Sequence, residues 1–303
     1  MGASFSEDLI NIITTISFTV IGLVGNSLVL YVFSRKEFRE KAMFRYLIAA
    51  TIFDILNLLL LWFYNYPEQF KMNTYSFNCK IIVYLVNFAY STNPWFILLS
   101  TFDRFLHVYY PHKFKFRNRL NFQLTQIALI IILMLIINLP FYFYFDLSGS
   151  LNETSCGYVE NIEMIGFIAV LLPFILMILS TVLIANKLIG KKIDQTNRIK
   201  HKNEKQFIKI LISMDLFFLI CNLPSCIYIL TSDLMSINYF GTFTYILVND
   251  LTLVYNSFSF FVYFFCNKLF KRYFLSMLSF NRFNRINVIH NTSQLHAVQT
   301  TGL

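Results

Sequence analysis

Long runs of apolar residues, separated by short polar segments, form the main pattern of the chain. There are seven, at about residues 10–34, 43–65, 77–105, 123–145, 161–189, 207–231 and 240–266. Each reaches the roughly 20 residues that a helix needs to cross a hydrocarbon core about 30 Å thick. Backbone polar groups must be hydrogen-bonded in lipid, and membrane strands would alternate apolar and polar residues, so each run is predicted to be a helix. The sequence therefore predicts an all-α membrane protein, a bundle of seven transmembrane helices.

Composition supports a membrane location and excludes other classes of protein. Of 303 residues, 56% are hydrophobic, 18% aromatic and 14% charged, whereas a soluble domain has about 25% charged residues. Disorder and a water-soluble enzyme are therefore excluded. A formal net charge of +9 would be typical of a protein that binds nucleic acid. In so apolar a chain it instead indicates charge asymmetry across a lipid bilayer, and no nucleic-acid partner is expected.

The basic residues predict the orientation in the membrane. All but two of the 25 lysines and arginines lie at or after the ends of the first, third, fifth and seventh runs, which share one side. That side is expected to face the cytoplasm. We therefore expect a multi-pass protein of the plasma membrane, with an extracellular N-terminus and a cytoplasmic C-terminus. The predicted organisation is an extracellular tail at 1–9, a transmembrane domain at 10–266 and a cytoplasmic tail at 280–303.

Cysteine positions predict one disulfide bond. Cys79 and Cys156 are the two cysteines expected in the outer aqueous layer, which is an oxidising compartment. We expect them to be bonded to each other, the alternative being two free thiols. Asn152, which begins an Asn-Glu-Thr sequence in the same outer loop, is a predicted glycosylation site.

Polar side chains within the predicted spans are candidates for function, because burying them in lipid is costly. Asp54, Asp215 and Asp250 are carboxylates in the second, sixth and seventh runs. The alternative is that such groups only join helices through interhelical hydrogen bonds. Proline, which removes a backbone hydrogen bond and bends a helix, occurs in four runs, as Pro94, Pro140, Pro173 and Pro224.

Short motifs follow one another along the chain in a specific order and spacing. They are Gly25-Asn26, Asp54, Cys79, Asp103-Arg104-Phe105, Pro173, Cys221-Asn222-Leu223-Pro224 and Ser259-Phe260-Phe261-Val262-Tyr263. Over about residues 10–280 this order resembles that of rhodopsin-like (class A) G-protein-coupled receptors. The amphipathic segment 267–279 resembles the short eighth helix of that family.

The chain also departs from the family pattern. Phe105 replaces a tyrosine, Asn222 a tryptophan and Thr181 a tyrosine, while Ser259-Phe260 stands where the family has Asn-Pro. With the stretch NSFSFFVYFF, these departures resemble invertebrate neuropeptide receptors and their orphan relatives.

The resemblance implies a signalling mechanism and its partners. It implies that the chain activates heterotrimeric G proteins through outward movement of the sixth helix, with arrestin as a further partner. The matching coupling positions are Asp103, Arg104, Phe105, Glu204 and Tyr263, and the matching switch positions are Pro173, Phe218, Asn222 and Pro224. The resemblance implies a salt bridge between Arg104 and Glu204 that holds the receptor in its inactive state. The alternative is a solvated Glu204.

The resemblance also implies two internal sites. A sodium pocket would comprise Asp54, Asn93, Asn256 and Ser259, and a ligand pocket would comprise Val86, Tyr90, Asn222, Cys226 and Asn249. A proton could neutralise Asp54 instead of sodium, and no other cofactor is expected. The seventh run has no lysine to hold retinal, and Val86 stands where amine receptors carry an aspartate. An acidic outer surface favours a basic peptide ligand.

Two other classes of protein fit the sequence less well. A polytopic transporter could use Asp54, Asp215 and Asp250 as a proton relay. However, this function would not explain the placement of Cys79 and Cys156 or the presence of Arg104. An intramembrane enzyme is not expected, because all five histidines lie in inner loops or the tail and the chain has no HExxH motif.

Overall fold

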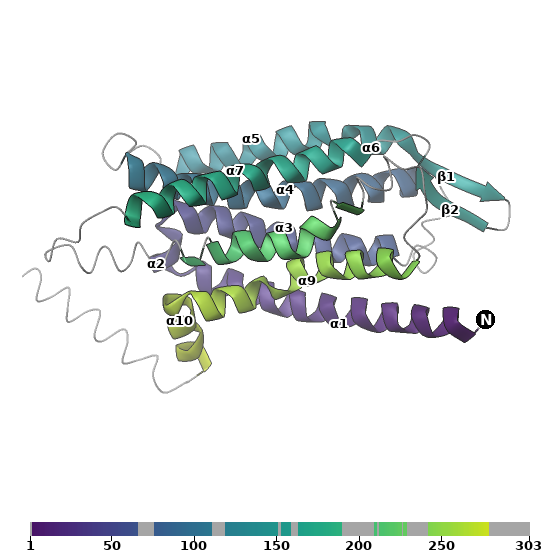
Figure 1. Ribbon diagram of the computed structural model, residues 1–303, viewed down its shortest axis with the longest axis horizontal. Coiled ribbons are helices and arrows are strands. Elements are labelled where there is room, and N and C mark those ends of the chain that lie inside the picture. The colour runs from purple at the N-terminus through teal and green to yellow at the C-terminus, as the bar shows by residue number, and fades with distance from the viewer. Residues whose placement is uncertain are drawn as a thin grey trace, which may run out of the picture.

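A computed structural model describes residues 2–65, 76–110, 119–150, 153–158, 163–189, 209–210, 212–225, 227–228 and 242–278. Long helices lie side by side along the longest axis of an elongated bundle (Figure 1). The helices are α1 (Gly2–Phe33), α2 (Lys36–Arg39), α3 (Ala42–Asn65), α4 (Ser76–Tyr109), α5 (Leu120–Ile137), α6 (Leu139–Tyr144), α7 (Glu163–Ile189), α9 (Thr242–Cys266) and α10 (Lys268–Leu278). We call the helical residues described between 209 and 228 the sixth span.

Every predicted span contains a helix. Among the described residues, four helices are long and apolar enough to cross a membrane, and three further apolar helices are shorter, at Leu171–Lys187, Ile212–Ser225 and Asp250–Cys266. Large apolar side chains on the outside of the bundle, such as Leu129 and Ile136 of α5, are 62% exposed. Such a surface suits lipid rather than water. The predicted seven-helix bundle is confirmed.

Two helix boundaries differ from the sequence prediction. α1 begins at Gly2, so the helix includes most of the segment predicted to be a tail. The fourth span is broken at Asn138 into α5 and α6, because the ring of Pro140 would clash with the carbonyl of Ile136 in a continuous helix. The Asn138 Nδ2 atom donates to Ser91 Oγ at 2.8 Å and to Met134 O at 2.8 Å, which fixes the break against α4.

The segment after α6 is not helical. The strands β1 (Phe145–Ser150) and β2 (Glu153–Tyr158) pair antiparallel, with Leu147 opposite Cys156. This hairpin, which the sequence analysis did not predict, lies at the same end of the bundle as the N-terminus (Figure 1). The helices α2 and α10 lie at the opposite end.

Aromatic side chains fasten α10 to the bundle. Phe33, Phe38, Tyr263 and Phe270 are almost fully buried, and the Phe33 ring lies 4.9 Å from that of Tyr263 and 5.5 Å from that of Phe270. Asn267 caps α10, since its Oδ1 atom accepts from the backbone N–H groups of Leu269 and Phe270 at 3.0 and 3.1 Å. We call Phe33, Phe38, Tyr263 and Phe270 the α10 aromatic cluster.

Candidate functional site

The arginine of the Asp-Arg-Phe motif lies near the α2 end of α4. Arg104 and Asp103 are both buried, and Arg104 Nε donates to the Sδ atom of Met43 on α3 at 3.1 Å. Burial and the nearby Arg104 guanidinium lower the pKa of Lys41, which lies just before α3. Glu204, the predicted partner of Arg104, lies outside the described residues, so that salt bridge stays a prediction.

Asp54 belongs to a hydrogen-bonded network between α3, α4 and α9, in which Asn93 is the shared partner. Asn93 Nδ2 donates to Asp54 Oδ1 and, at 3.3 Å, to Ala50 O. The hydroxyl of Tyr255 on α9 donates to Asn93 Oδ1 at 3.3 Å. The structure thus brings the two predicted residues Asp54 and Asn93 together and adds Tyr255.

The other two residues of the predicted sodium pocket are bonded to α1. Asn26 Nδ2 donates to the backbone carbonyl of Asn256 at 2.8 Å, and Ser259 Oγ donates to Asn26 Oδ1 at 2.6 Å. A carboxylate with amide and hydroxyl oxygens is a donor set that suits a hard cation. However, the side-chain bonds of Ser259 lead to Asn26 and not to Asp54, so the sodium site stays a prediction.

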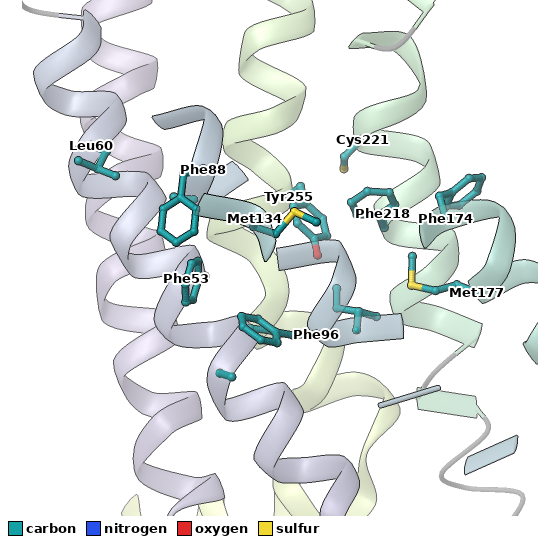
Figure 2. Packing of buried hydrophobic residues seen from close by; sticks show 14 of the residues in the cluster. Phe53, Leu60, Phe88, Phe96, Met134, Phe174, Met177, Phe218, Cys221 and Tyr255 are labelled. Atoms are coloured by element: carbon teal, nitrogen blue, oxygen red, sulfur yellow. The ribbon is translucent and has the colours of Figure 1, made fainter. Parts of the chain in front are cut away.

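Tyr255 is a central residue that the sequence analysis missed. Its ring is buried and lies 5.2 Å from that of Phe218 in the sixth span, at an interplanar angle of 86°. Phe218 in turn lies 5.7 Å from Phe174 of α7, beside Pro173. Figure 2 shows Tyr255, Phe218 and Phe174 in one packed group. The one signal in the sequence was a tyrosine four residues before Ser259, on the same face of the helix.

Within the predicted ligand pocket, the structure joins two residues directly. The hydroxyl of Tyr90 on α4 donates to Asn222 Oδ1 in the sixth span at 3.0 Å. Asn222 Nδ2 donates to the carbonyl of Phe218 at 3.0 Å. Val86 packs at the edge of the apolar core. The side chains of Cys226 and Asn249 lie outside the described part of the chain.

Cys79 is disulfide-bonded and buried at the hairpin end of α4. Cys221 and Cys266 are free. β1, which contacts α4, pairs with the strand that carries Cys156. The side chain of Cys156 and the residue Asn152 fall outside what the structure describes, so the pairing and the glycosylation site stay predictions.

A bundle of seven apolar helices with a polar network inside it defines a polytopic membrane protein. The family model described as "7 transmembrane receptor (rhodopsin family)" matches residues 25–266. The chain belongs to this family. No similar curated protein was found. The protein is therefore a multi-pass membrane receptor of the G-protein-coupled class and not an enzyme.

Proposed function

We propose that the protein is a cell-surface receptor that binds a peptide at the hairpin end of the bundle and activates heterotrimeric G proteins at the α10 end. In this proposal the N-terminus is extracellular and the C-terminus cytoplasmic. The observation that carries it is an unbroken path of contacts from the predicted ligand pocket to the middle of the bundle.

The path begins at Tyr90, which donates to Asn222 at 3.0 Å. Asn222 lies one turn from Phe218, whose ring contacts Tyr255 at 5.2 Å. The Tyr255 hydroxyl bonds Asn93, which bonds Asp54. A ligand that displaces Asn222 from Tyr90 would therefore alter the contact between the sixth span and α9. Each step joins groups that touch, so the path offers a physical route for coupling between the two sites.

At the opposite end, outward movement of the sixth span about Pro224 would open a cleft beside Arg104. We expect a salt bridge between Arg104 and Glu204 to resist this movement in the resting state. The opened cleft would take an amphipathic helix of the G-protein α subunit, a helix-in-groove mode of recognition. Arrestin would use the same cleft.

The charge of the outer segments supports a cationic ligand. The segments proposed to be extracellular contain eight acidic residues but only two basic ones, Lys71 and Lys80. The acidic residues are Glu7, Asp8, Glu68, Asp146, Glu153, Glu160, Glu163 and Asp233. Such a surface would steer a basic peptide toward the pocket.

The experiment that tests this function is a screen of basic neuropeptides on cells that express the receptor, with calcium and cAMP readouts. We expect a peptide whose binding weakens when guanine nucleotide uncouples the G protein. Ligand-independent ion or solute flux in reconstituted vesicles, without nucleotide-sensitive binding, would instead favour a transporter.

A further inference from the structure

Asp215 is a buried carboxylate that the signalling path does not use. It lies in the sixth span and is 5% exposed. The hydroxyl of Thr181 on α7 donates to Asp215 Oδ2 at 2.7 Å. Among the described residues, Asp215 Oδ1 has no hydrogen-bond partner. Within the described part of the chain, the Thr181 hydroxyl is therefore the one hydrogen-bond partner that replaces the water lost when this carboxyl group is buried.

Burying such a carboxyl group costs free energy, and the size of this cost depends on the position of the sixth span. A buried polar atom without a partner bears its full desolvation penalty, and that penalty is larger for an ionisable group. The Thr181 bond exists only while the sixth span lies against α7. If the sixth span moved outward, the carboxyl group would lose Thr181 but would regain water in the opened cleft.

Asp215 lies where its bond to Thr181 can affect the outward movement of the sixth span. Ile212, one turn toward the α10 end, packs against Ile184 of α7, and so does Phe105, the neighbour of Arg104. Phe218, one turn the other way, packs on Phe174. Asp215 therefore lies on the face that holds the sixth span to α7 (Figure 2 shows the Phe218 end of this face).

We propose that the Thr181–Asp215 hydrogen bond is a polar clamp that sets the balance between the resting and the outward position of the sixth span. Asp215 is a positioning residue in this role. The proposal rests on the proposed function only in that it takes outward movement as the activating step. The carboxyl group favours the outward position, and the Thr181 hydroxyl offsets that preference at rest.

The clamp predicts opposite effects for two substitutions. Thr181→Val leaves the carboxyl group buried without a partner, so it should increase the ratio of outward to resting populations about five- to tenfold. Adding Asp215→Leu to Thr181→Val removes the buried carboxyl group as well. Because replacing both partners by apolar groups is nearly neutral, the double variant should return to the wild-type distribution or to a more closed one.

The measurement is the distance between spin labels in the purified receptor in lipid nanodiscs. Labels at Asn121 and Lys209, which are exposed at the same end of the bundle, report the position of the sixth span relative to α5. The background replaces Cys221, Cys226 and Cys266 with Ala. Matched controls are Thr181→Ser, which keeps the hydroxyl, and Thr252→Val, whose hydroxyl donates within its own helix, to the carbonyl of Val248 at 3.4 Å.

We expect Thr181→Val to show a larger long-distance population, with Thr181→Ser and Thr252→Val unchanged. If Thr181→Val does not yield folded protein, Thr181→Ala serves the same comparison. A wild-type distribution in Thr181→Val, or a double variant as open as the single one, would overturn the clamp. The readout needs neither ligand nor G protein. An opened Thr181→Val receptor that never promotes nucleotide exchange would overturn the proposed coupling but leave the clamp in place.

Discussion

At the scale of single residues, α1 passes so close to α3 and α9 that one position has room only for hydrogen. A Cβ atom at Gly22 would lie 2.5 Å from Leu58 Cδ1, 2.9 Å from Ser257 Oγ and 3.0 Å from Ser257 Cα. Leu58 is fully buried, and Ser257 Cα belongs to the backbone, so neither can move away easily. Glycine at this position is a packing requirement.

We therefore expect Gly22→Ala to destabilise the receptor by about 1–3 kcal/mol, the usual cost of overpacking. The measurement is the apparent melting temperature of the detergent-purified protein. Ser27→Ala, at an exposed position of the same helix, is the matched control. Equal melting temperatures for the two variants would contradict the close approach.

Tyr255 combines a packing role and a hydrogen-bonding role that one substitution separates. Tyr255→Phe keeps the ring against Phe218 but removes the donor to Asn93. We expect this bond to favour the resting state. Because a net hydrogen bond contributes about 0.5–1.5 kcal/mol, its loss should raise basal signalling roughly two- to twelvefold. Basal nucleotide exchange is the readout, and Tyr144→Phe at an exposed site is the control. A changed melting temperature with unchanged exchange would indicate a purely structural role.

At the scale of helices, we expect the α10 aromatic cluster to keep α10 packed against the bundle. Phe270 is fully buried between Phe33, Phe260 and Tyr263. Truncation of a buried phenylalanine costs about 3–5 kcal/mol. Phe270→Ala should therefore detach α10 and lower the apparent melting temperature, whereas Leu278→Ala, on the exposed face of α10, should not. Equal proteolytic protection of α10 in both variants would refute this role for the cluster.

The predicted salt bridge would join Arg104 of α4 to Glu204, and it is testable without a ligand. Glu204→Ala should raise basal signalling, because removing one partner of a buried ion pair penalises the conformation that buries the other. Expression at the cell surface must be matched to the wild type before the comparison. Unchanged basal signalling at equal expression would count against the salt bridge.

Sequence patterns were sufficient for the helices but not for their contacts. Long apolar runs located every span, because lipid imposes the same length on each helix. They did not locate the break at Asn138 or the start of α1, since hydrophobicity alone does not end a helix. The bonds from Tyr255 to Asn93 and from Thr181 to Asp215 join residues 162 and 34 positions apart. These bonds depend on how each helix is rotated about its axis, which a single sequence does not specify.

At the scale of the whole molecule, the distribution of lysine and arginine predicts which side of the membrane each terminus lies on. An epitope tag at the N-terminus should be detected on intact cells, and one at the C-terminus only after permeabilisation. Asn152→Gln should remove a glycosidase-sensitive shift in mobility, because that residue would face the outside. Tags on one side, or on the reversed sides, would overturn the proposed direction of signalling.

The contact of α1 with α9 at Gly22 has a practical consequence. α1 and α9, the first and last spans of the bundle, meet at Gly22 without room for a larger side chain, whereas the proposed clamp lies between α7 and the sixth span. A fluorescent protein fused to either terminus should therefore report where the receptor is but not whether it has been switched on. A biosensor for activation should carry its fluorophore between α7 and the sixth span.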